Sequence, residues 1–302
     1  ITCQVQTVKL SKIKIDKNTA KAKGKIKVAI KGATRAEIDG ALKEKKFTYN
    51  EVSKITSVSG FPLPEHADLS FSGYPANCLS CHEDEAGEML QSTHYRWLGE
   101  APDMVNGAGE LQGKLDNAVN SYCVHILGNW PVCGSCHAGR GLAPDDPGAD
   151  QGNIDCLVCH SAAYAAGRTR LEDGAMGVTS PTDGMVRNVG RPTRANCLKC
   201  HAYAGGGDGV KRGDLSQALA DNSDARFDVH MNTTDADLSC QSCHEFEYHR
   251  VIGKGSDLRP TDDPDRGAEV ACTTCHTEMA GSGHDKKAIN THVSRVACQS
   301  CH

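Results

Sequence analysis

The stretch CLVCH at residues 156–160 decides the fold, because its arrangement of two cysteines and a histidine, C-x-x-C-H, recurs along the whole chain. The motif occurs seven times in 302 residues, as Cys78, Cys81, His82; Cys133, Cys136, His137; Cys156, Cys159, His160; Cys197, Cys200, His201; Cys240, Cys243, His244; Cys272, Cys275, His276; and Cys298, Cys301, His302. A random chain with 16 Cys and 14 His would contain about 0.04 such motifs. Only Cys3 and Cys123 lie outside them.

This spacing suits the covalent attachment of haem. The two thiols can add to the two vinyl groups on one porphyrin edge, and the next residue places its imidazole beneath the ring as the proximal iron ligand. The sequence therefore predicts seven molecules of haem c, one at each motif. A disulfide framework would not place His after every second Cys, and zinc ribbons need paired CxxC units without that His.

The composition agrees with an interior made largely of porphyrin. Only 38% of the residues are hydrophobic and 5% aromatic, but each haem offers two apolar faces that short segments can wrap. We therefore expect a mostly irregular and α-helical multihaem cytochrome fold, with many turns and almost no sheet. The net charge of −5 argues against nucleic acid as a partner.

No apolar run is long enough to span a membrane, and no signal peptide is present at Ile1. The chain is expected to be a processed export product, periplasmic or extracellular, because haem is attached to c-type cytochromes outside the cytoplasm.

Residues 1–60 contain no motif and predict a small β-rich segment. Apolar residues set among lysines at 8–15 and 26–30 indicate a hairpin, and residues 36–46 indicate a short amphipathic helix. This segment is expected to cap the first haem or to offer an edge strand to a neighbouring subunit. Residues 61–302 are expected to form one seven-haem domain, because motif starts 55, 23, 41, 43, 32 and 26 residues apart indicate neither a fixed repeat nor a linker.

Seven histidines remain once the proximal ones are set aside: His66, His94, His125, His230, His249, His284 and His292. Because their number equals the number of motifs, the sequence predicts a second His on every iron. Such bis-histidine ligation closes both faces of the iron and favours electron transfer over binding of a substrate. The sequence does not pair individual histidines with individual haems.

From about residue 66 onwards the chain resembles the octahaem tetrathionate reductase family of multihaem cytochromes. The resemblance is carried by CLSCHEDEAGEMLQSTHYRW (78–97), NSYCVHILGNWPVCGSCHAGRG (120–141), NIDCLVCH (153–160), GRPTRANCLKCHAYAGGGDGVKRGDL (190–215), DVHM (228–231) and HVSRVACQSCH (292–302). The family continues beyond CQSCH to an eighth haem, whereas this chain ends at His302. The chain is expected to be either a truncated fragment or a shortened relative with an exposed terminal haem.

In that family one haem has a lysine amine as its sixth ligand. The resemblance implies this role for Lys211, in the segment Asp208-Gly-Val-Lys211, at the haem of His137, in a pocket lined by Asn120 and Cys123. His125 would then be surplus. On the residues alone, Lys211 reads as a solvated lysine in a Gly-rich loop, and Cys123 as a buried thiol or a disulfide partner of Cys3.

Three functions follow from these patterns. The first is an electron conduit, in which closely packed haems pass electrons to other redox proteins or to further copies of the chain in a filament. The second is a reductase of tetrathionate, nitrite or hydroxylamine, in which substrate displaces Lys211, Cys123 acts as nucleophile and Asp208 handles the proton. The third is a small electron shuttle, which the number of haems disfavours. An electron carrier is preferred, and enzymatic activity stays open.

Overall fold

A computed structural model describes residues 9–16, 21–27, 47–50, 55–58, 64–101, 106, 110–116, 126–204, 207–209, 214–253, 262, 269–276, 284–293 and 295–301. Before residue 64 only the backbone of the strands is described. The longest described helix, α3, has nine residues. No helix among these residues is long and apolar enough to cross a membrane.

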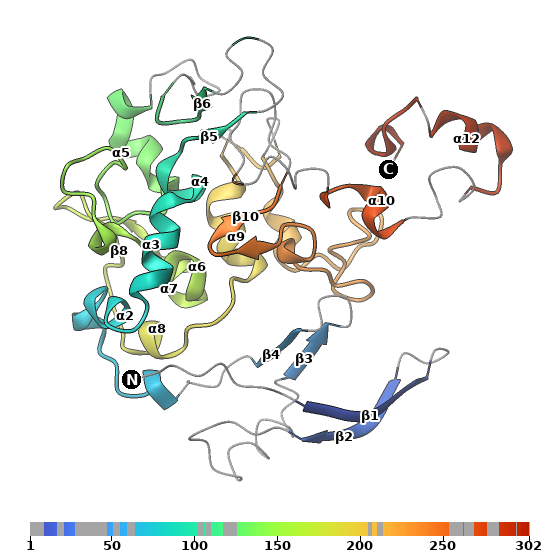
Figure 1. Cartoon of the computed structure of the whole chain (residues 1–302), viewed down its shortest axis with the longest axis horizontal. Helices are drawn as coiled ribbons and strands as arrows, with labels where there is room; N and C mark the ends of the chain where they lie inside the picture. The colour runs from blue at the N-terminus through green and yellow to red at the C-terminus, as the bar shows by residue number, and fades with distance from the viewer. Residues whose placement is uncertain are drawn as a thin grey trace. The chain divides into compact units, whose positions relative to one another are not determined.

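The chain folds into two compact units, each built from two separate segments. Unit 1 comprises Ile1–Glu83 and Asp155–Asp221, and unit 2 comprises Asp84–Ile154 and Asn222–His302. Figure 1 shows the elements along the chain, from β1 in dark blue to α12 in red. A boundary between a haem-free segment and a haem domain near residue 60 stays a prediction.

Unit 1 combines short strands with short helices. Its strands are β1 (Lys9–Asp16), β2 (Lys21–Lys27), β3 (Phe47–Asn50), β4 (Ile55–Val58), β7 (Thr169–Arg170) and β8 (Met176–Gly177). Its α-helices are α2 (Ala76–Leu79), α6 (Cys156–His160), α7 (Ala162–Gly167), α8 (Gly184–Arg187) and α9 (Arg194–His201). Its 3-10 helices are η1 (Pro64–His66), η2 (Phe71–Gly73) and η6 (Gln217–Ala220).

Unit 2 has the same character. Its α-helices are α3 (Glu83–Gln91), which begins at the unit boundary, α4 (Thr93–Arg96), α5 (Trp130–Cys133), α10 (Cys272–Cys275) and α12 (Lys287–His292). Its 3-10 helices are η3 (Leu127–Asn129), η4 (Gly134–Cys136), η5 (Gln151–Asn153), η7 (Cys240–Ser242) and η9 (Cys298–Ser300). Its strands are β5 (Gly99–Glu100), β6 (Leu111–Gln112), β9 (Phe246–Glu247) and β10 (Arg250–Val251).

Every sheet among the described residues has only two strands, in agreement with the expected scarcity of sheet. The hairpin expected near the N-terminus is present: β1 and β2 pair antiparallel, with Lys9 opposite Lys27 and Asp16 opposite Lys21. Strands β3 and β4 form a second antiparallel pair. The helix expected at residues 36–46 lies outside the described residues.

A small aromatic and aliphatic core holds unit 1 together. It consists of Tyr74, Leu157, Val158, Tyr164, Val178 and Val186. The ring centroids of Tyr74 and Tyr164 lie 6.1 Å apart in an edge-on arrangement, a favourable geometry for aromatic pairs. Because Ser161 is extended and its hydroxyl accepts from the backbone N–H of Tyr164, α6 ends at His160 and α7 begins directly after it.

A buried polar network lies beside this core. The carboxylate of Asp155 accepts from the Arg168 Nε at 2.6 Å and from the Tyr74 hydroxyl at 2.8 Å. The side chains of Arg168 and Asp155 are 1% and 0% exposed. Burial lowers the pKa of Arg168, but the charge of Asp155 and its hydrogen bond outweigh burial and leave that pKa raised. The network fixes the start of α6, because Asp155 directly precedes Cys156 and the Leu157 N–H donates to the Tyr74 hydroxyl at 3.3 Å.

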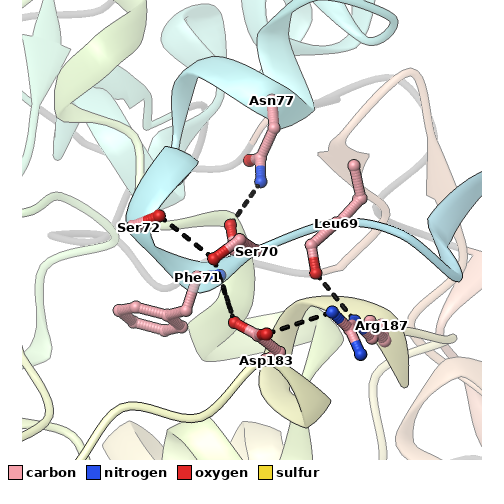
Figure 2. Close-up of polar contacts among 7 residues, drawn as sticks. All are labelled: Leu69, Ser70, Phe71, Ser72, Asn77, Asp183 and Arg187. Atoms are coloured by element: carbon pink, nitrogen blue, oxygen red, sulfur yellow. Dashed lines mark hydrogen bonds and ion pairs between the residues drawn. The ribbon is translucent and has the colours of Figure 1, made fainter.

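A second polar cluster attaches the segment before α2 to α8 (Figure 2). Asp183 accepts from the Phe71 N–H at 2.9 Å, from the Ser70 hydroxyl at 3.1 Å and from Arg187 at 3.0 Å. Arg187 in turn donates to the Leu69 carbonyl at 2.8 Å, and Asn77 of α2 donates to the Ser70 carbonyl at 2.9 Å. These bonds hold the turn that leads into the first CxxCH motif.

The Asp183 cluster predicts a dependence of stability on pH. The hydrogen bond from Phe71, followed by that from Ser70, holds the pKa of Asp183 below its ordinary value of 3.8. A lowered folded pKa means that the contribution is present above pH 3.8 and is lost as the pH falls through the folded pKa. In denaturant unfolding, Asp183→Asn should therefore be less stable than wild type at neutral pH, and the difference should shrink at about pH 3. Asp221→Asn, an exposed carboxylate in the same unit, is the control; a constant difference at both pH values would contradict the prediction.

In unit 2, Asp262 joins two elements that are far apart in sequence. Its carboxylate accepts from the Thr93 N–H, at the start of α4, at 2.6 Å and from the Val251 N–H of β10 at 2.8 Å. Arg250 also donates to the Asp262 carbonyl. Since Asp262 is 8% exposed, these bonds are made away from water and fix α4 against the β9–β10 hairpin.

Candidate haem-binding sites

The described CxxCH motifs are single helical turns. In the first, fifth and sixth motifs the N–H of His82, His244 and His276 donates to the carbonyl of the first cysteine, at 2.9, 2.8 and 2.9 Å. The third and fourth motifs lie within α6 and α9. Residues three apart share one face of a helix, so both thiols of a motif point to the same side.

Two pairs of histidine rings lie at a separation that suits a metal between them. The ring centroids of His66 and His82 are 6.3 Å apart, and those of His230 and His276 are 6.0 Å apart. A metal about 2 Å from one nitrogen of each ring would set the centroids about 6 Å apart. Each pair combines a predicted proximal with a predicted distal ligand, so the residues fit an iron held between them. The described residues contain no cluster of three or more His, Cys, Asp or Glu side chains that could hold a metal ion.

His94 of α4 is half-buried and lies near His244. Burial lowers the pKa of His94 most, Asp262 raises it in opposition, and the nearby His244 lowers it further. The His94 ring also lies 6.0 Å from the ring of Phe246. A neutral imidazole is the form that binds a metal, so burial favours the ligating form of His94.

Several histidines have their Nδ1 atom fixed by an oxygen. The pairs are His160 with the Gly190 carbonyl at 2.8 Å, His244 with the Ile252 carbonyl at 3.3 Å, His249 with the Glu88 carboxylate at 3.0 Å, and His284 with the Asn290 side-chain oxygen at 3.1 Å. Because these oxygens carry no proton, Nδ1 is the donor and Nε2 keeps the lone pair that can bind iron. The arrangement is typical of metal-ligating histidines.

Of the remaining predicted histidine ligands, the structure describes His201 and His292. His201 ends α9, where its carbonyl accepts from the Leu215 N–H at 2.9 Å, and His292 ends α12. His302 and His125 lie outside the described residues, so their predicted roles are not tested.

His137 differs from the other described histidines of the CxxCH motifs. It is 1% exposed, and its Nε2 lies 2.6 Å from the Tyr95 carbonyl oxygen. The rings of Tyr95, Trp97 and Trp130 lie 4.9, 5.1 and 5.3 Å from its ring. A Cβ at Gly139 would come within 2.6 Å of its Nδ1, so only glycine leaves room for the imidazole. Binding of iron through Nε2 requires this ring to turn away from Tyr95.

The aromatic residues around His137 were not predicted from the sequence. The scarcity of tryptophan was a hint, since the chain has only two and both pack against this histidine. Trp97 precedes the motif by 36 positions, however, and a contact at that distance depends on the fold.

Motifs that are distant in sequence meet within each unit. In unit 1, Cys78 and Cys156 both pack against the core, and the neighbouring Cys78 side chain, together with burial, raises the pKa of Cys156. In unit 2, burial and the neighbouring Cys275 raise the pKa of Cys243. The first motif is therefore a neighbour of the third, and the fifth is a neighbour of the sixth.

The residues predicted for a reductase site are mostly untested. Asn120, Cys123 and Lys211 lie outside the described residues. Asp208 is described, and its carboxylate accepts from the Ser216 hydroxyl at 2.8 Å and the Gln217 N–H at 2.6 Å. These bonds give Asp208 a structural role at the start of η6.

Comparisons with known proteins show similarity to cytochromes c. No protein-family profile matches the chain. The crystal structure of an octahaem cytochrome c from Shewanella oneidensis is similar, with 32% identity and a TM-score of 0.64 over 79% of this chain and 52% of that one. A high-molecular-weight cytochrome c from Nitratidesulfovibrio vulgaris is 23% identical over 280 residues, which are 90% of this chain and 40% of that protein. An uncharacterized protein of Archaeoglobus fulgidus is 29% identical over 221 residues, 57% of this chain and 73% of that protein.

By its motifs, fold and similarities, the chain is a multihaem c-type cytochrome, a class of protein that transfers electrons through covalently bound haem. It spans about half the length of the octahaem cytochrome that it matches.

Proposed function

We propose that this chain is an electron conduit that acts outside the cytoplasm, with seven haem c groups, one at each CxxCH motif. The observation that carries the proposal is the proximity of Cys78 and Cys156, which belong to different motifs and both pack against the core of unit 1. Groups attached through these two sulfurs would be close neighbours. The proximity of Cys243 and Cys275 supports the same arrangement in unit 2.

The distal histidines support a carrier rather than a catalyst. The pairs His66–His82 and His230–His276 would close both faces of an iron, which leaves no position for a substrate. Bound haem would supply one-electron oxidation and reduction. The protein would attach and orient it, and the oxygens at Nδ1 would fix the tautomers of His160, His249 and His284.

The proposed partners are other redox proteins outside the cytoplasm. Assembly with further copies of the chain is a finer prediction, for which the two-stranded sheet of β1 and β2 offers outer main-chain edges. Analytical ultracentrifugation and electron microscopy of the holoprotein test this assembly. A protein that stays monomeric over the whole concentration range would contradict the filament.

Haem content and spin state test the conduit. The wild-type holoprotein is expected to carry seven haems by intact mass, all of them six-coordinate and low-spin. His66→Ala and His230→Ala should each convert one haem to a high-spin signal in electron paramagnetic resonance, because each removes one iron ligand. Unchanged spectra in both variants, or fewer than seven haems in the wild type, would contradict the ligand set.

The same spectra test the reductase alternative, which the unusual surroundings of His137 favour. If Lys211 ligates the haem of His137, His125→Ala should leave every haem low-spin, and Lys211→Met should alter one. Methyl-viologen turnover of tetrathionate, nitrite or hydroxylamine that is lost in Lys211→Met and Cys123→Ala would establish catalysis at that haem. Conversion of one haem in His125→Ala, without turnover, supports the conduit.

A further inference from the structure

The β9–β10 hairpin presents His249 at its tip in an unusual backbone conformation. The two residues of the turn, Tyr248 and His249, have φ values of 51° and 59°. Two-residue turns of this kind favour Asn and Gly, because other side chains are strained at positive φ. Retaining a tyrosine and a histidine there costs stability, which points to a use for the side chain of His249.

Contacts at the base of the hairpin hold this tip in place. The Val251 N–H donates to Asp262, and the Ile252 carbonyl accepts from Nδ1 of His244, the proximal ligand of the fifth motif. The ring of Phe246 packs against His94. The hairpin is therefore anchored to residues of a predicted haem site, and these contacts support the turn that carries His249.

The side chain of His249 is oriented by a carboxylate from another element. Glu88, on α3, accepts from Nδ1 of His249 at 3.0 Å. The two side chains are 31% and 29% exposed, so most of this contact is shielded from water. The bond places the proton on Nδ1 and directs Nε2 away from Glu88.

We propose that Glu88 is the positioning residue that makes His249 a distal iron ligand and lowers the reduction potential of the haem bound there. A carboxylate on Nδ1 increases the basicity of the imidazole, and a more basic ligand stabilises the oxidised iron. Among the described histidines whose Nδ1 has an oxygen partner, His249 is paired with a carboxylate, and the others have carbonyl or amide oxygens. The proposal rests on the proposed function, because it needs His249 to ligate iron.

Spectroelectrochemical titration of the holoprotein tests the role of Glu88. Glu88→Gln keeps the size and a hydrogen-bond acceptor but removes the charge. At a fixed applied potential, the ratio of oxidised to reduced iron in one haem should fall about tenfold, which corresponds to about 59 mV for one electron. Asp84→Asn is the matched control, since Asp84 is an exposed carboxylate one turn earlier on α3. A shift in Glu88→Gln no larger than in Asp84→Asn overturns the potential-setting role.

A second measurement separates ligation from a surface ion pair. His249→Ala should convert one low-spin haem to high spin, and intact mass should show unchanged haem content. If every haem stays low-spin, His249 is not a ligand and the proposal fails, although the conduit still stands when His66→Ala and His230→Ala behave as expected. If those variants also leave the spectra unchanged, the proposed function itself fails.

Discussion

Replacement of Asp155 with alanine is expected to lower the free energy of unfolding by about 3–5 kcal/mol, because it leaves a buried cation without its partner. The Arg168 and Asp155 side chains are 1% and 0% exposed, and the same carboxylate accepts from the Tyr74 hydroxyl. Solvent cannot replace the lost interactions at this depth. Guanidinium unfolding of the holoprotein, followed by circular dichroism, measures the change.

Two controls identify the mechanism. Asp221→Ala removes an exposed carboxylate from the same unit and should cost little. The double variant Asp155→Leu with Arg168→Met should be more stable than Asp155→Ala, since it removes the unpaired charge as well. A loss of less than about 1 kcal/mol in Asp155→Ala would show that the network does not stabilise unit 1.

The Asp262→Ala variant is expected to lose about 3 kcal/mol, because two buried main-chain N–H groups lose a charged acceptor. These donors are Thr93, next to His94, and Val251, two residues beyond His249. The loss should therefore disturb ligation as well as stability, and the variant should show a fraction of high-spin haem that the wild type lacks. Electron paramagnetic resonance and denaturant unfolding of the same sample measure both effects.

Asp235→Ala provides the comparison, since Asp235 is exposed in the same unit. Asp262→Asn should fall between wild type and Asp262→Ala, because its amide oxygen retains one of the two acceptors. Equal stability of Asp262→Ala and Asp235→Ala would rule out the proposed attachment of α4 to the hairpin.

The motifs could be predicted from sequence because their geometry is local. A C-x-x-C-H segment places its thiols on one face of a single helical turn, and the hydrogen bond from His82 to Cys78 closes that turn. The candidate distal histidines could be counted in the same way. Their pairing could not, since His66 precedes His82 by 16 positions whereas His230 meets His276 across 46.

The residues that orient the histidines and stabilise the core could not be predicted from the sequence either. Glu88 is one of several carboxylates on α3, and its spacing from His249 carries no signal. In the sequence, Asp155 looks like any acidic residue that precedes a helix. Its partners Arg168 and Tyr74 are apparent only in the folded chain. Contacts of this kind arise when separate segments pack, so they follow from tertiary structure and not from periodicity.

The interleaving of the two units bears on biosynthesis. If the chain is exported with its N-terminus first, unit 1 is complete only once residue 221 has been exported. By then the first segment of unit 2 has already been exported. The first four motifs are therefore exposed to the attachment machinery before either unit is complete. Cleavage after residue 154 would yield fragments that each hold halves of both units, so neither half of the gene should be expected to express as a stable domain.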